Sequence, residues 1–465
     1  MPTHDGAEAE PLEARARTAV AAIPVDAITG ARWSGLAGQE PTSVVVLDAF
    51  EFDDGGVLAI LTALLPDGTA VTLTLPIEEA PPWSGLHRLA TRGGSVAGLH
   101  GGRLVGRPGT AMMPGSPAAG PGNREPIAVR LSPADQTHTS VILDERSILK
   151  LYRRLTTGPN PEAEVLGALA AVSSAPVPAW HGAVELVPSS GAVTTLAIEQ
   201  AFVPGVVDTF EFLADGLATW LAGDGERLST DIATGSGIAT GRLHAALAGV
   251  RGQAFLPRPA TANDRAAWVE AAERVLSTAI GAVRPANRGL AGRLERWAPA
   301  IRRALRPLAD PEIPVRLQRI HGDLHTGQIL AVQGGTLLVD FEGDPTRDPT
   351  ERRALRDPLR DVASFLRALD HVARSGYRRA TAGAHGRAGR QAAAMRDGWI
   401  NSSRGAFLAG YAAGLDAAAW SPPAAMLRAL EVEKELSEFI YAATFLPEWL
   451  YAPTAAMDAL LKAKR

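Results

Sequence analysis

The stretch that decides the fold is RIHGDLHTGQ, residues 319–328, which is followed twelve residues after Gln328 by DFEG, residues 340–343. A short hairpin between the two motifs would bring an amide and two acidic side chains together. Phosphoryl transfer from ATP requires such a set, because one carboxylate orients and deprotonates a hydroxyl while an amide and a second carboxylate hold Mg²⁺ against the phosphates. The sequence therefore predicts a phosphotransferase that uses ATP and Mg²⁺.

The two motifs assign a role to each polar side chain. Asp323 is the predicted catalytic base, a role typically worth ~10²–10⁴-fold in rate. Gln328 offers a hard amide oxygen, and Asp340 follows the apolar segment 336–339, so both are predicted Mg²⁺ ligands. His321 is expected to brace the loop through hydrogen bonds. The alternative is that these residues only form turns, but two such motifs, with an apolar strand before the second, argue against it.

Lys150 ends a predicted strand and precedes a predicted helix that carries two acidic residues. A strand lysine held by a helix glutamate places its ammonium on the ATP phosphates in kinases. Glu164 is the predicted partner, and Glu162 is the alternative. A lysine on a strand is usually just exposed, but its place upstream of the catalytic motif favours the nucleotide-binding role.

Other nucleotide contacts are predicted from position. Thr139 and Ser140 belong to a polar segment between two predicted strands, where a phosphate-covering loop would lie, although a plain polar hairpin explains them equally well. Gln200 and Phe202 lie in the connector 198–205, whose backbone would pair with adenine, but any domain linker would look similar. The chain has no Gly-x-x-x-x-Gly-Lys-Ser/Thr motif, which argues against a P-loop NTPase.

Composition narrows the class of protein. The 465 residues are too many for one core, and 46% hydrophobic with 21% charged residues is ordinary for a globular chain. A net charge of -4 gives no reason to expect nucleic acid or anionic membrane as a partner. The absence of cysteine excludes disulfides and thiolate chemistry. With neither a secretory signal nor a membrane-spanning stretch visible, we expect a cytoplasmic monomer or homodimer.

The order of strand and helix signals predicts an α+β, bilobal, eukaryotic-protein-kinase-like fold. Short apolar runs at 43–52, 57–65 and 70–76 indicate an antiparallel meander. Helical periodicity dominates after Pro204, and the Arg-, Gly- and Ala-rich segment 377–391 is expected to be a mobile insertion. The predicted parts are an N-terminal β-rich unit (1–105), a Gly/Pro-rich linker (106–125), a second β-rich part (126–203) and an α-helical part with the catalytic motifs (204–465).

These motifs resemble those of the actinobacterial maltokinase and glucosamine kinase group, which has the aminoglycoside-phosphotransferase-like fold. The resemblance covers most of the chain and is weakest in the first hundred residues. It is carried by residues 31–33, 139–142, 160–164, 321–328, 339–345, 351–353 and 358–363. It implies that residues 1–105 form an N-terminal cap subdomain, that 126–203 form an intermediate subdomain completing the N-lobe, and that 204–465 form an α-helical C-lobe with the catalytic and sugar-binding site. It also implies ATP, Mg²⁺ and a sugar acceptor. Within the last of these segments, Arg360 and Asp361 are expected to support the catalytic loop from a helix N-terminus.

The choice of sugar depends on two segments. The segment 341–345, which includes Glu342 as a predicted substrate contact, leans towards maltokinases, whereas 438–453 is similar to glucosamine kinases. A pocket carboxylate would favour an amino sugar, so Glu438 is a candidate beside Asp323. Trp449 could form an aromatic wall for the sugar. The alternatives without a functional role are that Glu438 is a solvated helix position and that Trp449 is a core aromatic residue.

The expected reaction is phosphorylation of glucosamine at O6, with maltose 1-phosphorylation as the alternative. An aminoglycoside phosphotransferase is a further alternative, because the acidic side chains of Glu431, Glu433, Glu435 and Glu438 could line a pocket for a polycation, although the N-terminal cap argues against it. A degenerate, non-catalytic kinase-fold binding module would require loss of the base, the metal ligands or the lysine. All of these are present in the sequence.

Overall fold

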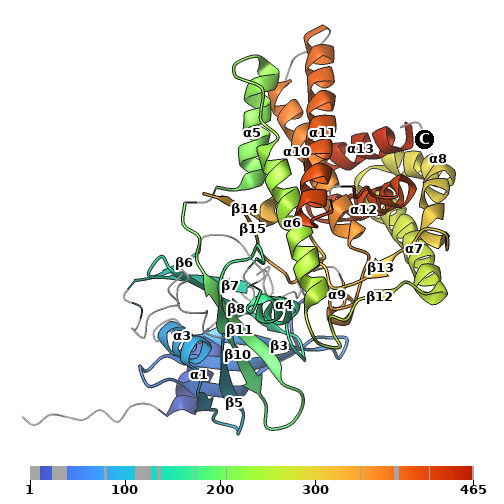
Figure 1. Ribbon diagram of the computed structural model, residues 1–465. Helices are drawn as coiled ribbons and strands as arrows, with labels where there is room; N and C mark the ends of the chain where they lie inside the picture. Colours follow the sequence, from blue (N-terminus) through green and yellow to red (C-terminus); the bar gives the residue numbers. More distant parts are fainter. Residues whose placement is uncertain are drawn as a thin grey trace, which may run out of the picture. The chain divides into compact units, whose positions relative to one another are not determined.

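The computed structural model describes residues 11–22, 39–77, 81–109, 126, 128–132, 138–172, 174–205, 207–345, 347–381, 387–417 and 419–462. The chain divides into two compact units: Met1–Ala171 with Pro178–Pro204, and Val172–Val177 with Gly205–Arg465. Figure 1 shows the strands of the first unit and the helices of the second. Each unit is described below by itself.

The first unit contains the predicted meander, which is confirmed. Strands β1 (Ser43–Glu51), β2 (Val57–Leu64) and β3 (Ala70–Pro76) pair antiparallel in sequence order, and β9 (Arg154–Leu155) adds to the edge of β3. Turns at Asp53-Asp54-Gly55-Gly56 and Pro66-Asp67-Gly68-Thr69 separate the strands, as their turn-forming residues predict.

A second, seven-stranded antiparallel sheet has the order β4-β5-β10-β11-β8-β7-β6. The predicted subdomain boundary at residue 105 is wrong, because it falls inside β5, which pairs with β10. Strands assigned to the cap and to the intermediate subdomain therefore share one sheet, and the predicted linker begins within a strand. Its residues 110–125 lie outside the described part of the chain. The strands are β4 (Ser95–Ala97), β5 (Arg103–Pro108), β6 (Val129–Leu131), β7 (His138–Leu143), β8 (Ser147–Tyr152), β10 (Trp180–Val187) and β11 (Thr194–Ala201).

Three helices accompany these sheets: α1 (Leu12–Ala22), α3 (Trp83–Arg92) and α4 (Pro161–Leu169). The sequence analysis did not predict α3, whose apolar face includes Leu86 and Leu89. These leucines pack in one core with Phe50 of the meander and Leu149 of the larger sheet. Helix α4 begins as predicted, with Pro161 at its first position and Asn160 accepting a cap hydrogen bond from the Glu162 N–H.

The second unit is mainly helical, as predicted. The prediction of a mobile insertion at 377–391 is corrected. Helix α10 continues through Ala380 and α11 begins at Arg387, and residues 382–386 lie outside the described structure. The longer helices are α5 (Thr209–Ala222), α6 (Asp231–Gly249), α7 (Ala262–Ala286), α8 (Arg288–Leu305), α10 (Leu359–Ala380), α11 (Arg387–Gly414), α12 (Ala424–Phe445) and α13 (Tyr451–Lys462). Shorter elements are η2 (Arg306–Ala309), η3 (Thr326–Gln328), η4 (Pro447–Trp449), α9 (Pro349–Arg352) and the two-stranded pairs β12 (Arg258–Pro259) with β13 (Arg316–Leu317) and β14 (Ile329–Val332) with β15 (Gly335–Leu338).

Helices α6 and α11 lie side by side, and glycines set how closely they approach (Figure 1). A Cβ on Gly237 would stand 2.1 Å from the Phe407 carbonyl oxygen, and one on Gly410 would stand 2.4 Å from that of Thr234. No side chain fits there without moving a backbone. This close packing brings His244 of α6 within 2.8 Å of the Tyr411 hydroxyl of α11. His244 also contacts Asp361, whose carboxylate accepts backbone N–H groups of the loop that carries Asp323.

Candidate active site

A β-hairpin joins the two sequence motifs. Strands β14 and β15 pair antiparallel, and the Val339 N–H then donates to the Gln328 carbonyl at 3.1 Å. The side chains at the two ends of the hairpin consequently meet, with Gln328 Nε2 donating to Asp340 Oδ2 at 3.0 Å. The structure therefore brings the two predicted metal ligands together.

Asp340 occupies a left-handed backbone conformation with φ 67°. Non-glycine residues pay of order 1–3 kcal/mol for such conformations, which persist where the surrounding structure holds them. A carboxylate oxygen of Asp340 lies within 4.8 Å of one of Glu342. The two carboxylates would form a donor set of hard oxygens, which fits Mg²⁺, if the Gln328 amide turned its oxygen toward them in place of Nε2. Glu342, predicted as a sugar contact, thus lies beside the predicted metal ligand Asp340.

The predicted base, Asp323, faces a lysine that the sequence analysis missed. Lys434 Nζ of α12 lies 3.5 Å from Asp323 Oδ1 and 3.0 Å from Glu438 Oε1. Burial alone would lower the pKa of Lys434, but the carboxylates of Glu438, Asp323 and Asp344 outweigh burial and raise it. The ammonium therefore stays charged. The only sequence signal for this contact was a single lysine within an acidic helix, and that signal does not say which residue it faces.

Asp361 supports the catalytic loop from the first turn of α10. Its carboxylate accepts the backbone N–H groups of His321 at 2.7 Å and Gly322 at 2.9 Å, and His244 Nε2 lies 2.9 Å from Oδ2. Burial would raise the pKa of Asp361, but the hydrogen bond and charge of His244, the charge of His321 and the Gly322 amide outweigh it and lower that pKa. Gly322 has φ 88°, a conformation that glycine adopts without steric cost.

His321 braces the loop from its other side. The ring is 1% exposed, its Nε2 lies 2.9 Å from the Val339 carbonyl, and it packs on Phe341 with ring centroids 4.7 Å apart. The residue before Asp340 and the residue after it thus both contact His321. This arrangement fixes the catalytic loop against the metal-binding motif.

Arg360 departs from the sequence expectation. Its Nη1 donates to Glu433 Oε1 of α12 at 2.9 Å, whereas the loop amides are bound by Asp361. Arg360 therefore connects α10 to α12. Two neighbouring acidic residues of α12 are similarly engaged: Glu431 pairs with Arg404 at 2.6 Å and Glu435 with His371 at 2.7 Å.

Glu438 and Trp449 have different surroundings. The Glu438 side chain is 21% exposed, and its second oxygen lies 4.0 Å from His371 Nδ1. Burial would raise its pKa, but Lys434 and His371 outweigh burial and lower it. Glu438 is therefore a charged, partly buried group that shares Lys434 with Asp323, and not a solvated helix position. The Trp449 ring packs on Phe210 and Tyr451, with centroids 5.7 and 5.4 Å away.

In the first unit, Lys150 on β8 is buried and pairs with a helix glutamate as predicted, but the residue is Glu162. Lys150 Nζ lies 2.8 and 3.1 Å from the two Glu162 oxygens, and Tyr152 Oη donates to the same carboxylate at 3.2 Å. Glu162 sits in the first turn of α4, where the helix dipole favours a negative charge. The assignment of this contact to Glu164 is corrected accordingly.

We expect Glu162→Gln to raise the KM for ATP by about tenfold, because removing the charge leaves Lys150 buried without its counter-ion and free to take other positions. Glu164→Gln, two residues further along the first turn of α4, is the matched control and should change that KM less than twofold. Steady-state kinetics with varied Mg-ATP would measure both variants. Equal effects of the two substitutions would contradict the assignment of the ion pair to Glu162.

The remaining nucleotide candidates lie on strands of the first unit. Thr139 and Ser140 are within β7 and not in a loop, which corrects the prediction. Thr139 Oγ1 accepts from Arg153 Nη1 at 3.0 Å, and Ser140 is buried opposite Lys150 in the strand register. Gln200 is a buried residue of β11, and the amide oxygen of its side chain has no hydrogen-bond partner within the described structure.

Phe202 follows β11 at the start of the connector between the units. Its backbone N–H donates to the Arg146 carbonyl at 2.8 Å, and the Arg130 guanidinium lies 5.6 Å from its ring centroid. These contacts fix the first residues of the connector to the sheet.

Among the described residues, every helix is too short or too polar to span a membrane.

A kinase-type catalytic loop, a hairpin, an acidic metal motif and a strand lysine paired with a helix glutamate together define a phosphotransferase of the kinase-like class. Residues 131–396 match the model of the phosphotransferase enzyme family, APH. The chain belongs to this family, and its fold is the kinase-like APH fold.

Characterised relatives narrow the similarity further. The chain is 33% identical over 338 residues to a glucosamine kinase of Streptacidiphilus jiangxiensis, covering 70% of this chain and 72% of that protein. It is 32% identical over 334 residues to a glucosamine kinase of Mycolicibacterium smegmatis, covering 70% and 78%. A solved glucosamine kinase in complex with glucosamine, ADP and inorganic phosphate aligns with TM-score 0.65 and 26% identity over 90% of this chain and 94% of that one. A second crystal form aligns with TM-score 0.70 and 25% identity over 96% and 99%.

Proposed function

We propose that this protein is an ATP-dependent glucosamine kinase that forms glucosamine 6-phosphate. The observation that carries the proposal is the similarity to glucosamine kinases, which covers 70% of the chain. The Glu438 carboxylate stands near the proposed base, with the Lys434 ammonium between the two. A carboxylate at this position would favour an amino sugar.

In this mechanism Asp323 orients the acceptor hydroxyl and takes its proton as the phosphorus is attacked. Gln328, Asp340 and Glu342 would hold Mg²⁺, which when bound neutralises charge on the phosphates. Lys150, fixed by Glu162, would contact the α- and β-phosphates, and Gln200 would lie at the adenine end. Glu438 would accept a hydrogen bond from the sugar ammonium, and Trp449 would offer an aromatic face at the edge of the acceptor site.

The acidic residues of α12 do not favour an aminoglycoside as acceptor. Glu431, Glu433 and Glu435 are at most 5% exposed and are paired with Arg404, Arg360 and His371. A polycation would have to compete with those buried partners. A coupled assay of ADP release with glucosamine, maltose, glucose and an aminoglycoside tests the assignment, and turnover of maltose without turnover of glucosamine would overturn it.

We expect Glu438→Gln to raise the KM for glucosamine by about ten- to one-hundredfold, because hydrogen bonds to charged groups are worth roughly 1.5–3 kcal/mol. The KM for ATP should change little. Glu312→Gln, at an exposed position of the same unit, is the matched control and should leave both constants unchanged. A Glu438→Gln enzyme with an unaltered KM for glucosamine would remove Glu438 from the acceptor site.

A further inference from the structure

A small pocket of about 50 Å³ lies against the catalytic loop, within the second unit. Gly322 of the loop and Asp344 of the metal-binding segment form part of its wall. Its cationic lining groups are Arg347, Arg356, Arg360 and Lys434, and its anionic lining groups are Asp344, Asp361 and Glu433. The proposed mechanism uses none of the three arginines.

The arginines differ in how closely carboxylates neutralise them. Arg360 has a hydrogen bond of 2.9 Å to Glu433. Arg347 lies 3.4 Å from Asp344 and 3.7 Å from Glu351, and Arg356 lies 4.0 Å from Glu351. Charge-assisted hydrogen bonds are normally about 2.7–2.9 Å long, and Glu351 is 59% exposed. Two guanidinium groups are thus only loosely matched by carboxylates of the chain.

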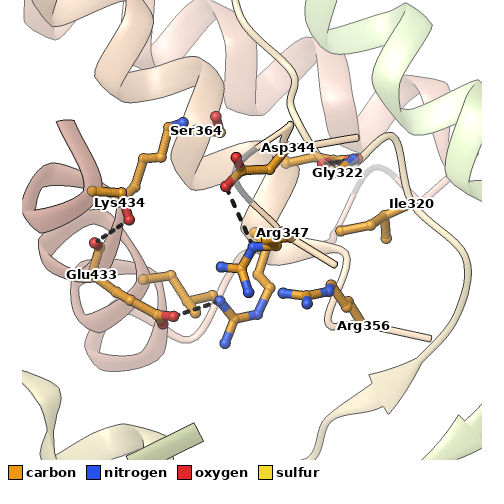
Figure 2. A pocket seen from close by; sticks show the side chains of 12 residues that line it. Ile320, Gly322, Asp344, Arg347, Arg356, Ser364, Glu433 and Lys434 are labelled. Atoms are coloured by element: carbon orange, nitrogen blue, oxygen red, sulfur yellow. Dashed lines mark hydrogen bonds and ion pairs between the residues drawn. The ribbon is translucent and has the colours of Figure 1, made fainter. Parts of the chain in front are cut away.

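Figure 2 shows the side chains of Arg347 and Arg356 close together at the pocket, below Asp344. Their side chains are 29% and 19% exposed. Burial, together with the charges of Arg347 and Arg360, lowers the pKa of Arg356 to about 10. The crowding of like charges in a partly buried space is unfavourable, and an anion between them would offset it.

We propose that this pocket binds a phosphate group. A site for one water needs roughly 10–15 Å³, so about 50 Å³ admits a group of about four or five non-hydrogen atoms, the size of a tetrahedral oxyanion. Arginine presents a planar fork of donors that matches phosphate oxygens in pairs. The group could be inorganic phosphate or the phosphate of a phosphorylated sugar. Its recognition by Arg347 and Arg356 would be the same.

A phosphate group here would connect the segment 344–356 to α10 and to the loop residue beside Asp323. The pocket wall includes Lys434, which contacts that base. Binding is therefore expected to stiffen the segment 344–356, which directly follows the predicted metal motif. The inference does not depend on which sugar the enzyme phosphorylates.

The test is calorimetric titration of the full chain, saturated with Mg-ADP, with inorganic phosphate and separately with glucosamine 6-phosphate at constant ionic strength. Chloride is the non-tetrahedral control. Wild type should bind at least one of the two phosphates, and both Arg347→Gln and Arg356→Gln should weaken that binding about tenfold or more. Arg288→Gln, an exposed position on α8, is the matched control and should bind as wild type does.

Arg347 is the first variant because its ion-pair contacts are 3.4 and 3.7 Å long, so we expect the substitution to leave the fold intact, which a thermal melt in chloride verifies. Preference for inorganic phosphate would identify a free ion as the ligand, and preference for the sugar phosphate would identify the product. Equal phosphate affinity in wild type and both arginine variants would overturn the proposal. So would binding that is lost in Asp340→Asn but kept in Arg356→Gln, since the phosphate would then occupy the nucleotide site.

Discussion

Asp323→Asn is expected to reduce kcat by at least ~10²–10⁴-fold, the usual contribution of a positioned base. The amide is nearly isosteric with the carboxylate but cannot take a proton from the acceptor hydroxyl. The carboxylate also contacts Lys434 at 3.5 Å, and this contact is long enough that its loss should not unfold the loop. Mg-ATP affinity should stay within about twofold, because the ligands Gln328 and Asp340 are unchanged. Single-turnover kinetics and nucleotide titration would measure the two quantities separately.

Asp224→Asn, at an exposed position before α6, provides the matched control for that substitution. Retention of more than a few per cent of wild-type kcat in Asp323→Asn would show that another group takes the proton. A parallel loss of Mg-ATP binding would instead indicate that Asp323 belongs to the metal site. The two outcomes contradict different parts of the proposed mechanism, so they can be told apart.

Local patterns in the sequence predicted much of the fold. The meander follows from apolar runs separated by turn residues, and the hairpin between Gln328 and Asp340 follows from an apolar segment of fixed length. Such signals depend on residues within a few positions of one another. The pairing of β5 with β10 does not follow from nearby residues, because those strands are far apart in sequence and either could pair elsewhere. The predicted boundary at residue 105 failed for this reason.

The same distinction applies to the candidate site. The sequence motifs located Asp323, Gln328 and Asp340, and the structure places the last two in contact. The sequence could not show that Lys434 faces Asp323, because that contact depends on how α12 packs in the unit. The sequence also could not show that Lys150 pairs with Glu162 and not with Glu164. A difference of two residues on α4 changes the direction of the side chain by about half a turn, and the preceding loop sets that rotation.

The support beneath the loop leads to the second large effect. We expect Asp361→Asn to cost about 3–5 kcal/mol in the free energy of unfolding, the usual result of removing one partner from a buried charged network. The variant cannot accept both loop amides and the His244 contact as a carboxylate does. Loss of these bonds should also release the loop that carries Asp323, so kcat should fall with stability. Urea unfolding and steady-state kinetics would measure the two effects.

Asp357→Asn is a demanding control, because Asp357 is also buried and lies four residues earlier. Burial raises the pKa of Asp357, so its charged form gains less from folding and the amide should cost less. Asp361 has a lowered pKa in the folded state. Its contribution to stability is therefore complete above the unfolded pKa of about 3.9 and is lost as the pH falls through the lower folded value. The stability difference between wild type and Asp361→Asn should be equal at pH 8 and pH 6 and should shrink below about pH 4. A difference that already shrinks between pH 8 and pH 6 would contradict the assignment of this stability to the Asp361 carboxylate.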